Sequence, residues 1–229
     1  MDIHEIINEK KKMLGFDYTD EKECLEAVRD NWMNLEFVQN QTELMCSIAV
    51  DRCGRALKFI ENQTPEMCEV AVKNNANAIK YVKNKTTDLC VAAVSKSGMM
   101  LQYIENQNRA ICLAAVKESG IALQFVKEQT VDICLAAVLT DAIALQYVKE
   151  QTEEMCMYAV NKCGYILYYV KKQTRNICMA AINQEPLSLQ YVKEQTPELC
   201  IAAVKLNPEA LIYVRDLSIL EGIDSIETE

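Results

Sequence analysis

The sequence predicts an all-α protein, an α-solenoid of nine 22-residue helix-turn-helix repeats, and two observations support this. The first is a strict internal period. A cysteine recurs every 22 residues without insertion or deletion, at positions Cys24, Cys46, Cys68, Cys90, Cys112, Cys134, Cys156, Cys178 and Cys200. An alanine follows each cysteine by three residues, and a phenylalanine or tyrosine by thirteen. The second is the scarcity of Gly (6) and Pro (4), which leaves little material for turns.

The first helix of each repeat has a recognisable start. In Thr64–Glu66 and Thr196–Glu198 a threonine can cap free N–H groups, proline fits the first turn, and the acid meets the positive end of the helix dipole. The same cap is expected at Thr42, Thr86, Thr130, Thr152 and Thr174, and at Asn108 in one repeat. The helix then becomes apolar almost all round, as in Ile133–Val138, which predicts packing between neighbours.

A second helix is expected after a break eight residues beyond the cysteine. Gly or Pro marks the break at Gly54, Gly98, Gly120, Gly164, Pro186 and Pro208. In residues 144–150, a spacing of 100° per residue places Gln146, Lys149 and Glu150 on a wet arc opposite the apolar one. One hairpin buries too little to fold alone, so stacking must supply the core, and nine layers predict a rod on the order of 80 Å long.

The two ends of the chain are expected to differ from the middle. Residues 1–19 are predicted to form an N-terminal capping helix, 20–216 the nine-repeat α-solenoid, and 217–229 an acidic C-terminal cap or tail. The capping helix carries an apolar stripe of Ile3, Ile6, Ile7 and Leu14. In the last repeat Leu206 and Ile212 stand at usually polar positions, and we expect Leu217, Ile219 and Leu220 to cover them.

The repeat unit, Gln129–Val138 followed by 144–149, resembles the family known as domain of unknown function 4116. The resemblance extends over about 195 of the 229 residues. Repeats of this family are abundant in giant DNA viruses of amoebae, so the resemblance implies a viral or protist origin. It implies no activity.

Composition and charge indicate a soluble chain. The net charge is −9, residues 216–229 hold five acids and no base, and no run of 18 apolar residues occurs. The N-terminus lacks the apolar stretch of a signal peptide. We therefore expect the cytoplasm, which for a viral protein means the host cytoplasm or the virion, and no membrane contact.

The nine cysteines in register are interpreted as small buried residues. One cysteine per stacked helix is too distant from the next for a disulfide, and neither a Cys-x-x-Cys pair nor a partner for the single histidine, His4, is present. We expect no metal, no cofactor and no catalysis, since phosphate-loop and nucleophile motifs are also lacking. Cys53 and Cys163 are expected to be exposed thiols in the turns.

Two polar series could mark a nucleic-acid surface. Cations recur at one repeat position, in Lys83, Lys127, Lys149, Lys171, Lys193 and Arg215. A solvated face is the favoured interpretation of this series, because Glu or Asn follows most members. Gln102, Gln124, Gln146 and Gln190 could read bases, but the acidic chain disfavours this.

The predicted function is a non-catalytic scaffold that binds another protein. The alternatives are a structural component of a virion or other assembly and, less favoured, a nucleic-acid-binding helical repeat. Large amphipathic rings beside cations dominate interface energetics, and the seventh repeat departs from the others by carrying them. The candidate protein-binding residues are Tyr158, Tyr165, Tyr168, Lys171, Lys172 and Arg175.

Overall fold

The computed structural model describes residues 20–218, and the chain forms two compact units, Met1–Ala114 and Ala115–Glu229. The predicted capping helix at residues 1–19 lies outside the described residues. So do Ile219 and Leu220 of the predicted C-terminal cap. Leu206 and Ile212, which that cap was expected to cover, are 54% and 75% exposed.

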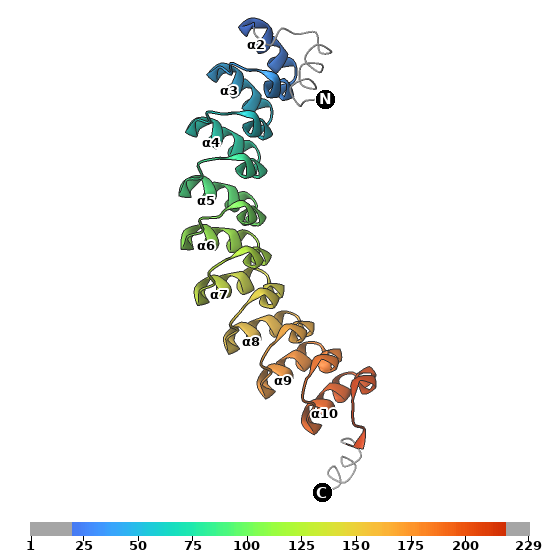
Figure 1. The fold of residues 1–229 in the computed structure, drawn as a ribbon. Helices are drawn as coiled ribbons and strands as arrows, with labels where there is room; N and C mark the ends of the chain where they lie inside the picture. The colour runs from blue at the N-terminus through green and yellow to red at the C-terminus, as the bar shows by residue number, and fades with distance from the viewer. Residues whose placement is uncertain (1–19, 219–229) are drawn as a thin grey trace, which may run out of the picture. The chain divides into compact units, whose positions relative to one another are not determined.

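The prediction of an all-helical repeat is confirmed. Over residues 20–218, nine α-helices alternate with nine short 3-10 helices, and no strand occurs (Figure 1). The first unit contains α2 (Glu21–Asp30), η1 (Trp32–Phe37), α3 (Glu43–Arg52), η2 (Gly54–Phe59), α4 (Pro65–Asn74), η3 (Ala76–Tyr81), α5 (Thr87–Lys96) and η4 (Gly98–Tyr103). Helix α6 (Arg109–Glu118) spans the boundary between the units. The second unit contains η5 (Gly120–Phe125), α7 (Val131–Thr140), η6 (Ala142–Tyr147), α8 (Glu153–Lys162), η7 (Gly164–Tyr169), α9 (Arg175–Gln184), η8 (Pro186–Tyr191), α10 (Pro197–Leu206) and η9 (Pro208–Tyr213).

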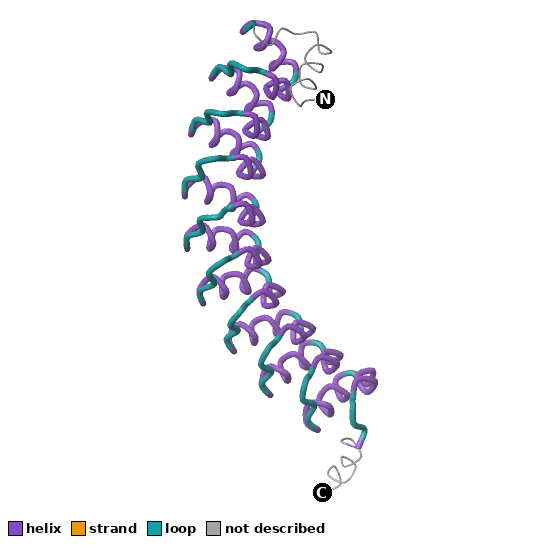
Figure 2. Tube along the Cα trace, viewed as in Figure 1, coloured by secondary structure: helices purple, strands orange, loops and turns teal. Residues whose placement is uncertain are grey.

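Each unit is a stack in which α-helices pack against α-helices and 3-10 helices pack against 3-10 helices. Helix α9 packs between α8 and α10, while η8 packs between η7 and η9, so the α-helices labelled in Figure 1 form one side and the 3-10 helices the other. Figure 2 shows the helices of the repeats and the loops that join them. The core lies between the two sides. In the seventh repeat it contains the cysteine, alanine and valine of α8 and the leucine of η7, namely Cys156, Ala159, Val160 and Leu167, all at most 3% exposed.

The predicted N-caps are confirmed in all but one case. The hydroxyls of Thr42, Thr64, Thr86, Thr152, Thr174 and Thr196 each accept a hydrogen bond from the backbone N–H three residues later. Asn108 caps α6 in the same way through its side-chain oxygen. The prediction was wrong for Thr130, because its hydroxyl donates instead to the carboxylate of Asp132.

The second helix of each repeat is a 3-10 helix and is shorter than predicted. In the sixth repeat it ends at Tyr147, so Lys149 and Glu150 follow the helix and do not lie on its wet arc. The reason is local. The Val148 N–H bonds to the Leu145 carbonyl three residues back, and the Lys149 N–H donates to Gln129 Oε1 at 2.9 Å, which leaves no donor to continue the helix.

The predicted breaks between the two helices of a repeat are confirmed. The glycines at these breaks allow the backbone of the next α-helix to approach closely. Each marked Gly or Pro is the first residue of a 3-10 helix, and the residue before it is extended. A Cβ atom on Gly164 would lie 2.4 Å from the Ala181 carbonyl oxygen of the next α-helix. Glycine therefore allows the two repeats to approach at this point.

A glutamine five residues before the repeat cysteine joins consecutive repeats within each unit. Gln151 Nε2 donates to the carbonyls of Leu145 at 3.1 Å and Tyr169 at 2.9 Å, at the ends of η6 and η7. Its Oε1 accepts from the Lys171 N–H at 2.8 Å and from the Cys156 thiol at 3.7 Å. One amide thus uses both its donors and its acceptor to hold two 3-10 helices in register.

The same pattern recurs along the chain, and we call these residues the bridging glutamines: Gln41, Gln63, Gln129, Gln151, Gln173 and Gln195. The cysteine thiol donates to this amide in seven repeats, at 3.5 to 3.8 Å. The repeat cysteine is therefore a hydrogen-bond donor as well as a small buried residue. In the fourth repeat Lys85 takes the place of the glutamine and donates to the Val82 carbonyl.

The series of cations has a structural role in these stacks. Lys193 Nζ donates to the carbonyls of Val170 at 3.0 Å and Lys171 at 2.8 Å, just past the C-terminal end of η7. Lys83, Lys149, Lys171 and Arg215 make the equivalent bonds to the preceding repeat. Their side chains are exposed, as predicted, but their charged ends are directed at backbone carbonyls, where cations are favourable.

One buried polar atom in this core has no partner. The Ser188 side chain is fully buried in η8, and its hydroxyl makes no hydrogen bond. Ala122, Ala144 and Ala210 occupy this position in other repeats of the unit. Replacing Ser188 with alanine removes a desolvated hydroxyl, so we expect the free energy of unfolding in urea to rise by about 1 kcal/mol. A fall of that size would show that the hydroxyl has a stabilising partner.

Candidate functional site

The 3-10 side of each unit presents two outward positions per repeat. A 3-10 helix has three residues per turn, so its second and fifth residues lie one above the other. In η7 these are Tyr165 and Tyr168, which are 38% and 63% exposed. The structure therefore brings two of the six predicted site residues together on one short helix.

Four rings form a tyrosine cluster on η7 and η8: Tyr165, Tyr168, Tyr169 and Tyr191. The Tyr168 ring meets Tyr169 and Tyr191 edge to face, with centroids 5.0 and 5.4 Å apart. Tyr165 meets Tyr191 at 6.2 Å. Edge-to-face packing is the favoured geometry for aromatic pairs, so these exposed rings are held in place by their neighbours.

A carboxylate anchors the edge of this cluster. The Tyr165 hydroxyl donates to Glu185 Oε1 at 3.1 Å, and Glu185 is the residue that precedes η8. Desolvation, followed by this hydrogen bond and the negative charge of Glu185, raises the pKa of the Tyr165 phenol above its usual value. Tyr165 therefore stays neutral near pH 7 and keeps its hydroxyl proton.

Tyr158 lies apart from the tyrosine cluster. It is half-buried on α8, where its hydroxyl donates to the Leu139 carbonyl of α7 at 3.3 Å. The Lys162 ammonium lies 5.4 Å from the centre of its ring. Both contacts are on the α-helical side, so this tyrosine packs against its neighbouring repeat.

The three predicted cations lie between η7 and the start of α9. Lys171 Nζ donates to the carbonyls of Val148 and Lys149, at 3.0 and 2.7 Å. Arg175 forms a bidentate ion pair with Glu198 of α10, and both side chains are at least half exposed. Lys172 is exposed on the connecting segment. The structure thus places these cations in the inter-repeat region and directs two of the three at other groups of the protein.

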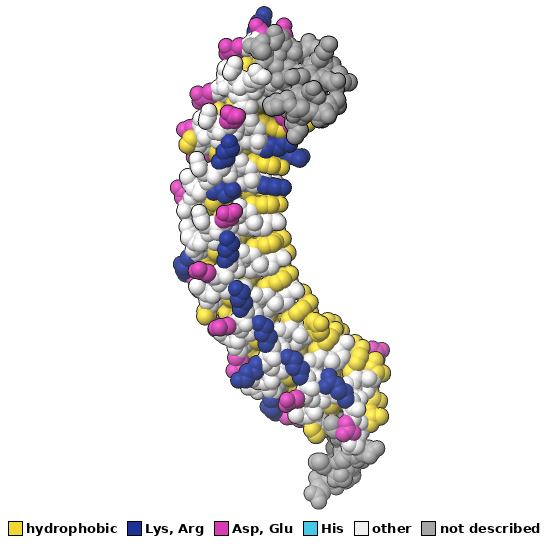
Figure 3. All heavy atoms as spheres, in the orientation of Figure 1, with side chains coloured by type: hydrophobic (Ala, Val, Ile, Leu, Met, Phe, Trp, Pro, Cys, Tyr) yellow, Lys and Arg dark blue, Asp and Glu magenta, His cyan; other side chains and the backbone are white. Residues whose placement is uncertain are grey.

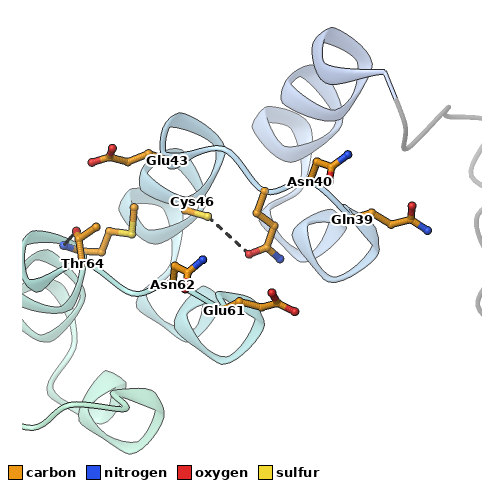
Figure 4. Close-up of a pocket in the computed structure, with 9 residues that line it drawn as sticks. Gln39, Asn40, Glu43, Cys46, Glu61, Asn62 and Thr64 are labelled. Atoms are coloured by element: carbon orange, nitrogen blue, oxygen red, sulfur yellow. Dashed lines mark hydrogen bonds between the residues drawn. The ribbon is translucent and has the colours of Figure 1, made fainter.

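Shallow pockets open between the starts of neighbouring α-helices. In the second unit, pockets of about 250 and 720 Å³ are both lined by Lys171, Lys172 and Thr174. In the first unit, a pocket of about 390 Å³ between α3 and α4 is lined by Glu43 and Glu61 (Figure 4). The Cys46 thiol and its glutamine partner lie at its inner wall. These pockets lack converging catalytic groups and follow from the stacking of the repeats.

The repeat cysteines are buried, which suppresses the reactivity of their thiols. All eleven cysteines are free, and the nine repeat cysteines are buried. Burial raises the pKa of the Cys46 thiol to about 11, with Glu43 adding to the effect, and burial also raises the pKa of Cys156 and Cys178. Cys163 is exposed, as predicted, whereas Cys53 is half-buried. No group of three potential metal ligands converges within residues 20–218.

This arrangement predicts how the thiols respond to reagent and to pH. Near pH 8 an aromatic disulfide reagent should label Cys163 rapidly and the repeat cysteines only on unfolding, because the thiolate is the nucleophile. A raised pKa in the folded state stabilises the protein below the unfolded value of about 9. We therefore expect the free energy of unfolding to fall as the pH rises from about 9 to 11. Rapid labelling of several repeat cysteines in the folded protein would contradict their burial.

Hydrophobic side chains follow the 3-10 side of each unit. Figure 3 shows them in yellow, with dark blue Lys or Arg side chains among them in the first unit, while charged groups are scattered over the rest of the visible face. From η5 to η8 the outward positions hold no charge: Ile121, Gln124, Ile143, Gln146, Tyr165, Tyr168, Leu187 and Gln190. The glutamine amides of this series donate to carbonyls of their own helices, as Gln146 does to Ile143 at 3.2 Å.

Two members of the tyrosine cluster were missed by the sequence analysis. Tyr169 and Tyr191 occupy the aromatic position thirteen residues after the cysteine, which was assigned to the core. Both rings are half-buried and support Tyr168 from either side. The signal that could have found them is the same aromatic period, combined with the eclipsed stacking of a 3-10 helix.

The fold and this surface define the protein as a helical repeat protein whose second unit bears tyrosines on its 3-10 face, where the outward positions from η5 to η8 hold no charge. Residues 152–196, which include the whole tyrosine cluster, match the domain of unknown function 4116. The resemblance seen in the sequence is confirmed for this stretch. No curated protein and no solved structure matches the chain. No helix within residues 20–218 is long and apolar enough to cross a bilayer.

Proposed function

We propose that the protein is a non-catalytic scaffold that binds another protein through the 3-10 side of its second unit. The observation that carries the proposal is Tyr168, 63% exposed yet fixed by edge-to-face contacts with Tyr169 and Tyr191. A rigid exposed tyrosine loses little side-chain entropy on binding and offers both apolar area and a hydroxyl, which is why tyrosine is enriched among hot spots.

The setting of the tyrosine cluster favours a protein partner over a polyanion. The neighbouring outward positions on η6 and η8 hold Ile143, Gln146, Leu187 and Gln190, and the charged group that touches the cluster is the Glu185 carboxylate, which would repel a polyanion. Lys171 and Lys193 of the second unit are directed at backbone carbonyls, and Arg175 is directed at Glu198. A catalytic role for the repeat cysteines is not part of the proposal, since their thiols are buried and burial raises the pKa of Cys156. An origin in a giant virus and a place in the host cytoplasm or virion remain part of this proposal.

A comparative purification tests the proposed function. The tagged full chain and a variant carrying Tyr165→Ile and Tyr168→Gln are used to capture proteins from the native host, followed by quantitative mass spectrometry. The substituted residues are those that sibling repeats carry at these positions, as in Ile143 and Gln146, so the fold should be retained. We expect at least one protein to be enriched by the native chain and lost with the variant. Identical sets of captured proteins would refute the proposed surface.

A further inference from the structure

A second feature stands out on the 3-10 side of the first unit. The outward positions of η2 and η3 carry Arg55, Lys58 and Lys80, which we call the basic patch. All three side chains are exposed. Arg55 and Lys58 are three residues apart on one 3-10 helix, so they lie one above the other, and Lys80 follows on the helix packed beside it.

Aromatic rings lie beneath the two ammonium groups. Lys58 Nζ is 4.2 Å from the centre of the Phe59 ring. Lys80 Nζ lies between two rings, 5.7 Å from that of Tyr81 and 5.5 Å from that of Tyr103. These contacts position the charges over half-buried rings and leave their outer sides open to solvent. Figure 3 shows dark blue side chains between hydrophobic ones on this side of the unit.

Within residues 20–218, none of the three cations of the basic patch forms an ion pair with a carboxylate. The other outward positions from η2 to η4 hold Asn77, Met99 and Gln102, and the first acid at such a position is Glu36 on η1. This concentration of positive charge occurs in a chain whose net charge is −9.

We propose that the basic patch binds an acidic peptide segment of a partner protein. Carboxylates of the peptide pair with Arg55, Lys58 and Lys80, and its apolar side chains contact the exposed parts of the Phe59 and Tyr81 rings. The charge complementarity supplies the recognition, since guanidinium and ammonium groups over apolar rings fit carboxylates next to hydrophobic residues. This site is in a different unit from the tyrosine cluster and does not rest on it.

The size of the basic patch favours a short peptide over a nucleic acid. Three cations can neutralise only about three phosphates, and binding to polyanions gains affinity with the number of phosphates neutralised. A longer strand would extend over Asn77, Met99 and Gln102 on η3 and η4, which offer its phosphates no further cation. The rings also offer their faces to the lysines, which leaves those faces unavailable for stacking with bases.

The test is a selection from a random peptide library displayed on phage, with the full chain immobilised. We expect enriched peptides to combine several Asp or Glu with aliphatic or aromatic residues. Binding of the best peptide, measured by fluorescence anisotropy, should weaken at least about tenfold in the variant Lys58→Gln with Lys80→Gln. Glutamine occupies this position in other repeats, as in Gln102 and Gln124, so the substitutions preserve the fold.

The matched control changes the same net charge on the α-helical side of the same unit, with Arg52→Gln and Lys73→Gln. Both residues are exposed near the ends of α3 and α4. This pair should leave the affinity within about twofold, and Tyr165→Ile with Tyr168→Gln should also leave it unchanged. The proposal is overturned if no acidic peptide is enriched, if the Arg52 and Lys73 control pair weakens binding as much as the Lys58 and Lys80 pair, or if a twelve-nucleotide oligothymidylate binds more tightly than the best peptide.

Discussion

Replacing the bridging glutamine Gln151 with alanine should lower the free energy of unfolding by about 3 kcal/mol. The substitution leaves the carbonyls of Leu145 and Tyr169 and the N–H of Lys171 without their partner, and the Cys156 thiol loses its acceptor. A part-buried backbone group that loses its hydrogen bond costs about 1 to 3 kcal/mol, and water entering the inter-repeat pocket recovers some of this. Urea denaturation followed by circular dichroism measures the change.

The matched control for this prediction is Gln146→Ala on the neighbouring 3-10 helix. Its amide makes one hydrogen bond, to the Ile143 carbonyl of its own helix, and its side chain is half-buried. We expect a change of at most about 0.5 kcal/mol. If the two variants were equally stable, the bridging glutamines could not be what holds consecutive repeats in register.

The second large effect concerns binding. Once a partner is identified, Tyr165→Ile with Tyr168→Gln should weaken its binding by about 2 kcal/mol or more, close to thirtyfold in Kd. Binding weakens because the surface loses two rings that are held in place by their neighbours. The fold is retained because sibling repeats carry Ile and Gln at these positions. The melting temperature should change by no more than a few degrees. Calorimetric titration and thermal denaturation measure the two quantities.

The substitution Tyr158→Ala should affect stability and leave binding unchanged, the opposite of the Tyr165 and Tyr168 variant. This ring packs on α7 through its hydroxyl and lies apart from the tyrosine cluster. Alanine occupies its position in the neighbouring repeats, as Ala136 and Ala180 show. We expect a lower melting temperature with unchanged affinity. A Tyr165 and Tyr168 variant that binds normally but melts early would mean that these rings serve packing, and the binding surface would lie elsewhere.

The sequence allowed most of the fold to be predicted because the period is strict and each position has a simple physical demand. The threonine caps, the breaks at Gly or Pro and the buried cysteine, alanine and valine could all be assigned from one repeat and transferred to the rest. The type of the second helix in each repeat could not be predicted. Six residues between two extended ones fit an α-helix or a 3-10 helix equally well by pattern, and hydrogen bonds such as Lys149 N–H to Gln129 Oε1 decide between them.

The bridging glutamines escaped prediction for a related reason. Gln151 and its equivalents precede the capping threonine, in a position that reads as an exposed loop. Their partners are the backbone of 3-10 helices 6 residues before and 18 residues after them. The lysine series was likewise read as solvated, because a sequence does not show that an ammonium group points at carbonyls 22 residues earlier.

Part of the candidate surface could be predicted because it departs from the repeat. Tyr168 replaces a glutamine that recurs in sibling repeats, Tyr165 adds a ring at a variable position, and Lys172 stands where Glu or Asn usually follows the recurring cation. Lys171 and Arg175 were included with them, but the structure directs these two cations at backbone carbonyls and at Glu198. Tyr169 and Tyr191 conform to the repeat, so no comparison among repeats could separate their supporting role from simple burial.

Site-specific photo-crosslinking tests the central claim most directly, that the 3-10 side of the second unit binds a protein. A photoreactive phenylalanine is placed at residue 146 on η6, a half-buried outward position, or at residue 161 on α8, which is exposed, and both residues are polar in the native chain. The crosslinked products are then identified by mass spectrometry. Our account predicts a discrete adduct with one partner protein from position 146 and none from position 161. The same adduct formed from position 161 alone would contradict it.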